Sequence, residues 1–300
     1  MKLVSIVVAT YKREAELKRA LASLATQTYP NIEIVLVDDN ADAAWNEAVS
    51  AVAEEFRGQF PQIPLQYIVN TCNRGSAETR NIGIEAAAGE YVTFLDDDDV
   101  YLPSKVEKQL SLMESGGYDY SITDLELYNE NGKLCGRVNR LAYIREGMTA
   151  EELLCAHLKY HLTGTDTMMF TKAYLLKIGG FSPINVGDEF YLMQKAIEGG
   201  GTFAYLPGSE VHAYVHTGEC AGVSSGDGKI RGEKEIYRYK KTLFHKIDRK
   251  SRRYICTRHY AVLAYAQWRR RRFFAFAYNA TRAILVSPIG CFKIIKERRR

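Results

Sequence analysis

The stretch that decides the fold is residues 90–103, which read EYVTFLDDDDVYLP. Its apolar part, Tyr91–Leu95, is rich in β-branched and aromatic residues and is typical of a buried strand. Four consecutive aspartates follow, Asp96 to Asp99, and their like charges repel one another. A hard divalent cation such as Mg²⁺ or Mn²⁺ removes this conflict, because it prefers carboxylate oxygens. Since ligands bind at the carboxyl ends of strands in open α/β sheets, we predict an active site here; an acidic helix-capping loop is the alternative.

Strand and helix patterns alternate around this stretch. Residues 3–9 form a continuous apolar run, as expected of a strand that is buried on both faces. The helical pattern that follows places apolar residues at 17, 20, 21 and 24. Further strand patterns cover 32–37 and 65–69, and further helical patterns cover 43–60 and 77–88. This alternation predicts βαβ units and an α/β fold with a Rossmann-like, mostly parallel sheet that is flanked by helices.

The second half of the chain predicts a mixture of shorter elements. A helix is expected from Pro103 to about Ser115, and a hairpin from strands at 118–128 and 133–138. Thr149 opens a capping box before a short helix. The remaining expected elements are a strand at 165–171, helices at 172–178 and 187–198, strands at 202–206 and 210–216, and a loop or linker at 222–232.

The charge is distributed very unevenly. Residues 229–300 hold 22 of the 40 Lys and Arg residues but 4 of the 36 Asp and Glu residues, a net charge of +18. Residues 1–228 therefore hold the other 18 basic and 32 acidic residues, a net charge of −14. The acidic excess predicts metal and phosphate chemistry within residues 1–228. We expect residues 229–300 to be a basic helical extension that attaches to an anionic surface.

Several protein classes are disfavoured by what the sequence does not contain. The six cysteines form no Cys-x-x-Cys pair, which argues against a zinc site or a disulfide framework and fits a reducing cytosol. The first apolar run is too short for a signal peptide, and no uncharged stretch has the length of a transmembrane helix. No Gly-rich phosphate loop follows the first strand pattern, which argues against dinucleotide and P-loop readings.

Four further polar residues are candidates for the site, each with a plain structural alternative. Asp39 ends the second strand pattern, where it would accept a hydrogen bond from a base or ribose, or cap the helix that follows Asn40. Arg80 would pair with diphosphate oxygens or form an ordinary ion pair. Asp188 and Glu189 would supply a general base, or simply favour the helix dipole at a helix start.

Together these pieces resemble the family 2 glycosyltransferases with the GT-A fold. The resemblance covers about the first 220 residues, and its first half is the more specific. It implies a catalytic domain at 1–228, with a donor-binding part at 1–115 and an acceptor part at 116–228. It rests on eight motifs in order: VSIVVATY (4–11), QTYPNIEIV (27–35), VDD (37–39), NRG (73–75), TRNIG (79–83), AGEYVTFLDDDD (88–99), GGF (179–181) and GDEF (187–190).

The resemblance implies a nucleotide-sugar donor, expected to be a UDP-sugar, a Mg²⁺ or Mn²⁺ ion held through an Asp-x-Asp element, and inversion at the anomeric carbon. It implies that Asp98 is the direct metal ligand and that His216 lies near the diphosphate and the ion. The remaining donor-binding residues that it implies are Thr10, Tyr11 and Asp39 around the nucleoside, Arg80 at the diphosphate, Asp96 facing the ribose and a metal-bound water, and Asp97 beside them.

The residue that acts as the general base is less directly identified by the resemblance. The base in the family is usually the Asp of a Glu-Asp pair, but this chain has the order Asp188-Glu189. Alignment with the family therefore places Glu189 at the position of the base, with Asp188 as its neighbour or substitute. A carboxylate there would remove the proton of the acceptor hydroxyl as that hydroxyl attacks.

The extension combines clustered arginines with apolar residues. Arg269–Arg272 precede the run FFAFAY (273–278), and ILV follows at 284–286. Because Arg282 interrupts the apolar pattern, we expect a helix lying in a membrane interface rather than one spanning it. Nucleic-acid binding and a packed dimerisation helix are the competing readings; we do not expect a nucleic-acid partner, and homo-oligomer formation stays open.

The sequence thus predicts an inverting, metal-dependent glycosyltransferase that acts on a lipid-linked glycan or cell-surface polysaccharide precursor. We expect it in the cytoplasm, peripherally bound at the inner face of the cell membrane. A sugar nucleotidyltransferase is one alternative, although it should carry a Gly-rich phosphate loop. A non-catalytic nucleotide-sugar-binding scaffold on membranes is the other.

Overall fold

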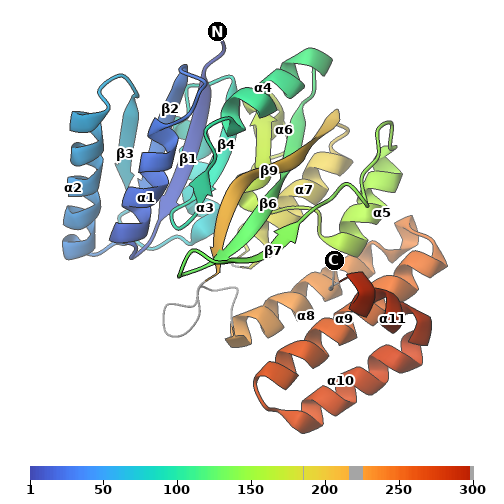
Figure 1. Cartoon of the computed structure of the whole chain (residues 1–300). Helices are drawn as coiled ribbons and strands as arrows, with labels where there is room; N and C mark the ends of the chain where they lie inside the picture. Colours follow the sequence, from blue (N-terminus) through green and yellow to red (C-terminus); the bar gives the residue numbers. More distant parts are fainter. Residues whose placement is uncertain (185, 216–225, 298–300) are drawn as a thin grey trace. The chain divides into compact units, whose positions relative to one another are not determined.

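The computed structural model describes residues 1–184, 186–215 and 226–297 (Figure 1). The chain divides into two compact units. The first, here called the sheet unit, comprises Met1–Glu146 and Leu162–Thr217; the second, here called the helical unit, comprises Gly147–His161 and Gly218–Arg300. The predicted division into domains at residue 228 stays a prediction.

The sheet unit follows the expected order of strands and helices. Its elements are β1 (Val4–Thr10), α1 (Glu14–Ala25), β2 (Ile32–Asp38), α2 (Ala43–Gln59), β3 (Leu65–Val69), α3 (Ser76–Ala86), β4 (Tyr91–Asp96), β5 (Val100–Tyr101), α4 (Lys105–Gly116), β6 (Tyr120–Asn129), β7 (Leu134–Val138), η1 (Thr165–Thr167), β8 (Met168–Thr171), α6 (Lys172–Lys177), α7 (Asp188–Glu198) and β9 (Phe203–Val215).

Among the described residues, the strands form one sheet in the order β3-β2-β1-β4-β8-β6-β9-β5, with β7 paired to β6. β1 pairs in parallel with β2 and β4, and β2 pairs in parallel with β3, as the alternating patterns predict. β8 runs antiparallel between β4 and β6, whereas β9 is parallel to β6. The mixed α/β class is confirmed, and the continuous parallel pairing is confined to the first four strands of the sheet.

Three details of the second half differ from the patterns. Residues 226–232 of the expected loop or linker belong to the helix α8 (Gly226–Thr242). Residues 165–167 form the 3-10 helix η1, and the strand begins only at Met168. One strand, β9, replaces the two short strands expected at 202–206 and 210–216; its pairing with β6 shifts register twice instead of ending. An irregular ladder of this kind breaks the period of two on which a strand prediction depends.

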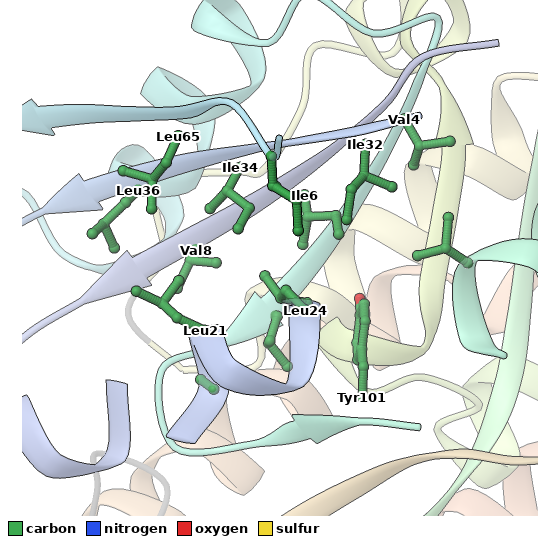
Figure 2. Close-up of a cluster of buried hydrophobic side chains, with 14 of the residues drawn as sticks. Val4, Ile6, Val8, Leu21, Leu24, Ile32, Ile34, Leu36, Leu65 and Tyr101 are labelled. Carbon is green, nitrogen blue, oxygen red and sulfur yellow. The ribbon is translucent and has the colours of Figure 1, made fainter. Parts of the chain in front are cut away.

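The core of the sheet unit lies between the sheet and α1. Alternate residues of β1 (Val4, Ile6 and Val8) point to the same face and pack with Leu21 and Leu24 of α1 (Figure 2). Equivalent residues of β2 continue this cluster toward β3. The predicted apolar stripe of α1 is therefore its buried face.

The opposite face of β1 packs against α3 at short range. α3 contacts β1 and β2, and its Gly83 faces the side chains of Val7 and Val37. A Cβ atom at Gly83 would overlap the Val7 side chain and lie 3.4 Å from Cγ2 of Val37. The missing side chain therefore allows α3 to lie close to the strands, which determines where Arg80, one turn earlier, meets the sheet edge.

Gly83→Ala is expected to lower the free energy of unfolding by about 1–3 kcal/mol, because Val7 is buried and β-branched and has little room to move. The matched control is Gly58→Ala in α2, where nothing lies within 4 Å of the new Cβ. That change should raise the free energy of unfolding by about 0.5–1 kcal/mol through helix propensity. Urea denaturation of both variants tests this; an unchanged or more stable Gly83→Ala protein would contradict the close packing.

The helical unit contains helices only, among its described residues. They are α5 (Ala150–Tyr160), α8 (Gly226–Thr242), η2 (Phe244–Lys246), α9 (Arg249–Arg269), α10 (Phe273–Val286) and α11 (Pro288–Glu297). Thr149 and Glu152 make both hydrogen bonds of the predicted capping box at the start of α5. No helix in the described parts of the chain is both long enough and apolar enough to cross a membrane.

Candidate active site

The carboxyl ends of β1, β2 and β4 meet at one edge of the sheet. The parallel register places Ala9 beside Asp96 and Thr10 beside Asp38. Chain segments leaving these strands therefore carry their polar residues to a common place, as the sequence predicted for an open α/β sheet. The polar residues form three groups there, around Asp39, Asp97 and Arg80.

Asp39 holds the loop that leads into α3. Its carboxylate accepts hydrogen bonds from the backbone N–H groups of Arg74 (2.8 Å) and Gly75 (2.9 Å) and from the side chain of Asn70 (2.8 Å). Asp39 does not cap the helix after Asn40; Asp42 does, by accepting from the backbone of Trp45. The buried Asp39 carboxylate thus connects β2 to the start of α3, next to the predicted nucleoside pocket.

Asp97 fastens the turn after β1. Its carboxylate accepts hydrogen bonds from the Thr10 hydroxyl (2.9 Å) and the Tyr11 backbone N–H (3.0 Å), and it forms an ion pair with Arg13 (2.8 Å). Burial raises the pKa of Asp97, and the charge of Arg13 opposes that rise. Thr10, Tyr11 and Asp97 therefore lie together and contact one another; their assignment to the donor stays a prediction. The Tyr11 side chain is exposed.

Arg13 also reaches the predicted metal ligand. Its Nη1 lies 2.7 Å from Oδ2 of Asp98, and Arg19 donates a hydrogen bond to the Asp98 carbonyl (2.8 Å). Burial tends to lower the pKa of Arg13, but the charges of Asp97 and Asp98 raise it. The sequence analysis did not identify Arg13. Its position three residues after β1, at the sheet edge that carries the acidic run, is the signal that was available.

Arg80 joins two parts of the site that lie far apart in the chain. Its guanidinium forms ion pairs with Asp96 at the end of β4 (2.5 Å) and with Asp188 at the start of α7 (2.6 Å). It also lies over the ring of Phe181, 5.4 Å from the centroid. Burial lowers the pKa of this group, but the charges of Asp96 and Asp188 outweigh burial and raise it. Arg80 is therefore a fixed positive charge at the sheet edge.

Arg80→Met is expected to lower the free energy of unfolding by about 3–5 kcal/mol, because it leaves two carboxylates without their buried partner. Arg74→Met is the matched control, since Arg74 pairs with Glu78 on the surface of the same segment (2.5 Å). Loss of that exposed pair should change the stability by less than about 1 kcal/mol. Chemical denaturation measures both, and equal effects of the two substitutions would contradict a buried network at Arg80.

Asp188 and Glu189 occupy the first turn of α7, but their surroundings differ. Asp188 is buried and accepts hydrogen bonds from Arg80, from the Ser76 hydroxyl (3.1 Å) and from the Glu189 backbone (3.0 Å). Glu189 is only half-buried. Burial raises the pKa of both carboxyls. Asp188 thus acts as the partner of Arg80, and Glu189 is the more accessible carboxylate.

A buried carboxylate that the sequence analysis missed lies beside the acidic run. Asp166 in η1 accepts a hydrogen bond from the Asp96 backbone N–H (2.6 Å). Burial, which is the largest cause, and the charge of Asp96 raise the pKa of Asp166 to about 7. Burial, again the largest cause, and the charge of Asp166 raise the pKa of Asp99 well above its usual range. Asp166 reaches the acidic run because β8, the strand that follows it, pairs antiparallel with β4. A contact of this kind depends on tertiary structure, so no local sequence pattern indicates it.

These carboxylates fit a divalent cation. One oxygen each of Asp96, Asp99 and Asp166 lie within 4.8 Å of one another, and oxygen is the ligand that Mg²⁺ and Mn²⁺ prefer. Asp98, which the resemblance implies as the direct ligand, follows in the same turn after β4. His216, the second implied metal residue, lies outside the described residues.

Solved structures of known proteins have a fold similar to that of this chain. Staphylococcus aureus TarS 1–349 in complex with UDP-GlcNAc aligns with a TM-score of 0.59 at 18% identity, covering 99% of this chain and 92% of TarS 1–349. The mannosyltransferase PcManGT from Pyrobaculum calidifontis, in complex with GDP-Man and Mn²⁺, has a TM-score of 0.59 at 16% identity, covering 96% and 85%. The similarity confirms the predicted GT-A fold.

Sequence relatives and a family model agree with that fold. An uncharacterized glycosyltransferase of Haemophilus influenzae is 32% identical over 185 residues, which is 60% of this chain and 56% of that protein. The Escherichia coli enzyme UDP-Glc:alpha-D-GlcNAc-diphosphoundecaprenol beta-1,3-glucosyltransferase WfgD is 29% identical over 129 residues, 43% of this chain and 48% of WfgD. The chain thus spans about half the length of these two curated relatives.

The model named Glycosyl transferase family 2 matches residues 5–197, well over half of the chain. The chain therefore belongs to glycosyl transferase family 2.

Proposed function

We propose that this protein transfers a sugar from a UDP-sugar to a hydroxyl group of a lipid-linked glycan or polysaccharide precursor, with inversion at the anomeric carbon. The observation that carries the proposal is the network of Arg80, Asp96 and Asp188, with Glu189 beside it, at the sheet edge of a family 2 glycosyltransferase. The names of similar proteins support the substrate class: WfgD uses UDP-Glc and a diphosphoundecaprenol acceptor, and TarS was solved with UDP-GlcNAc.

Donor binding is assigned to the carboxyl ends of β1, β2 and β4. Thr10, Tyr11 and Asp39 line the nucleoside pocket, and Asp97 keeps the turn after β1 in place through its bonds to Thr10 and Tyr11. Asp96 faces the ribose. Arg80 supplies positive charge to the diphosphate, because its planar guanidinium offers five N–H donors and the two carboxylates engage only part of them.

A divalent metal completes the diphosphate site in this proposal. We assign Asp98 and His216 as the residues that hold Mg²⁺ or Mn²⁺; Asp96, Asp99 and Asp166 are the alternative set. When bound, the ion neutralises the charge that develops on the leaving nucleoside diphosphate. Asp98 lies within reach of Arg13, so the same carboxylate has a cationic partner without the metal.

The general base in this proposal is Glu189. Its carboxylate takes the proton of the acceptor hydroxyl as the oxygen attacks the anomeric carbon from the face opposite the leaving group. Burial raises the pKa of Glu189 above its ordinary value, which makes it a stronger base than an exposed glutamate. Asp188 positions Arg80 and the first turn of α7. The displacement occurs in one step and inverts the anomeric centre.

The test is a transfer assay with a panel of nucleotide sugars and a polyprenyl-diphosphate GlcNAc acceptor. We expect product from one UDP-sugar, dependence on Mg²⁺ or Mn²⁺, and an inverted anomeric configuration by NMR. Release of pyrophosphate from a nucleoside triphosphate and a sugar phosphate would instead indicate a nucleotidyltransferase. Donor binding without turnover on any acceptor of this class would indicate a scaffold. Either result would overturn the proposal.

We further place the reaction at the inner face of the cell membrane, where the protein would be peripherally bound. A lipid-linked acceptor requires an enzyme that reaches the membrane surface, and the basic composition of residues 229–300 suits an anionic one.

A further inference from the structure

Exposed apolar side chains are concentrated at the end of the helical unit. Ten of the sixteen large hydrophobic side chains that are exposed in the described chain lie between residues 265 and 295. Most of them belong to α10 and α11, which are drawn in orange and red in Figure 1. Scattered single exposed residues need no explanation, but a concentration of this kind marks an interaction surface.

On α10 the three most exposed of these side chains share one face. Phe274 is 96% exposed and Leu285 is 74% exposed, and Tyr278 is also exposed. The three are spaced by four and seven residues, so they lie along one side of the helix. The other side of α10 carries the buried Asn279 and Ala283 and packs on α9.

The next helix, α11, also exposes apolar side chains. Ile289 and Phe292 of α11 are 74% and 70% exposed, and their spacing of three residues again places them on one side. We call the exposed side chains of Phe274, Tyr278, Leu285, Ile289 and Phe292 the apolar face.

The charged residues from the start of α9 to the end of α11 are almost all basic. Residues 249–297 contain twelve Lys and Arg residues and a single acidic residue, Glu297. Arg269–Arg272 precede α10, and Arg271 and Arg272 are exposed. Arg282 and Lys293 are exposed on α10 and α11 themselves. Arg282 lies over the ring of Tyr278, 5.9 Å from its centroid, so a cation accompanies the apolar face, which matches an anionic partner.

The physical features favour a lipid surface over other anionic or apolar partners. A second copy of the same face would bring like charges together across a two-fold axis. Single-stranded nucleic acid is bound through basic residues and through aromatic rings on which the bases stack, and Leu285 and Ile289 offer no stacking surface. A short amphipathic helix with aromatic and aliphatic residues on one side and arginines beside it has the properties of a helix that lies in the membrane interface.

We propose that the apolar face of α10 and α11 inserts into the interface of an anionic membrane while the neighbouring arginines and lysines contact lipid headgroups. Membrane insertion brings the chain to the surface where a lipid-linked acceptor is found. The insertion proposal nevertheless rests on the observations of α10 and α11 alone, because membrane binding requires neither donor nor turnover. Failure of the transferase proposal would leave it intact.

The experiment is vesicle flotation with the full chain. Wild type should float with vesicles of phosphatidylcholine and phosphatidylglycerol and bind pure phosphatidylcholine at least about tenfold more weakly, since each cation near an anionic surface favours binding. The double variant Phe274→Ser/Leu285→Ser should reduce partitioning into the anionic vesicles at least about tenfold, because two large apolar side chains no longer leave water. High salt should release wild type only in part, since screening acts on charges and not on apolar burial.

The control variant is Leu176→Ser on α6, which removes another exposed leucine, in the sheet unit. It should float as wild type does. Circular dichroism and thermal melting should be unchanged in all variants, because the substituted side chains are exposed.

Equal flotation of wild type and the double variant would overturn the proposal. So would a wild-type dimer that the double variant dissolves while vesicle binding stays the same, because the face would then bind a second copy. Binding of single-stranded RNA that competes with vesicles and is lost in the double variant would assign the face to nucleic acid instead.

Discussion

Glu189→Gln is expected to lower the turnover number by about a hundredfold to ten-thousandfold, the usual effect of removing a general base. The amide has nearly the same shape as the carboxylate but cannot take a proton from the acceptor hydroxyl. Affinity for the nucleotide sugar should stay near that of wild type, because the proposed donor contacts come from other residues. Steady-state kinetics, with donor affinity measured separately by calorimetry, separate the two quantities.

The pH dependence gives this prediction a second readout. Burial raises the pKa of Glu189 above the usual value of 4.5, and a base acts only when it is deprotonated. Turnover of wild type should therefore fall as the pH falls through that raised pKa, and be retained above it. In Glu189→Gln the residual turnover should lose this acidic limb.

Asp188→Asn is the matched control, because it makes the same chemical change one residue earlier. Asp188 contacts Arg80 and Ser76, so its loss should weaken donor binding and stability but reduce turnover less than Glu189→Gln does. The acidic limb of the pH profile should persist. If Asp188→Asn proves the more damaging substitution and also removes that limb, Asp188 is the base. If neither substitution slows transfer, the base lies elsewhere in the chain.

Asp98→Asn is expected to abolish metal-dependent turnover and to weaken Mn²⁺ binding by more than about a hundredfold, since loss of even a residue behind a metal ligand costs about 10–100-fold. The substitution removes one charge and little volume, so the fold should persist. Free Mn²⁺ can be followed by electron paramagnetic resonance in the presence of UDP, which reports on the ion without requiring transfer.

Asp166→Asn distinguishes the two sets of carboxylates. If Asp98 holds the ion, Asp166→Asn should leave most of the Mn²⁺ affinity in place, because Asp166 is buried and accepts a bond from the Asp96 backbone. Loss of Mn²⁺ binding in Asp166→Asn but not in Asp98→Asn would assign the ion to Asp96, Asp99 and Asp166. Full activity of Asp98→Asn at limiting metal would remove Asp98 from the metal site altogether.

Local patterns were sufficient to predict most elements of the sheet unit. The period of α1, the apolar run of β1 and the capping box at Thr149 each depend on residues a few positions apart, and the structure contains all three. The motifs along the first half of the chain were likewise sufficient to predict the family. Prediction was poorer where a ladder is irregular, as in β9 with its two register shifts.

The partners of the candidate residues were beyond the reach of local patterns. Asp97 was grouped with donor-binding residues, yet its carboxylate binds Thr10 and Arg13, more than eighty residues earlier. Arg80 was expected to meet a diphosphate, and its partners Asp96 and Asp188 come from β4 and α7. Asp166 has no recognisable motif and reaches Asp96 only because β8 pairs with β4. Hydrogen bonds and ion pairs between distant segments depend on the order of strands in the sheet and on how closely α3 packs against it. The order of strands and the packing of α3 do not produce a periodic pattern in these residues, because periodicity indicates only which side of one element faces the core.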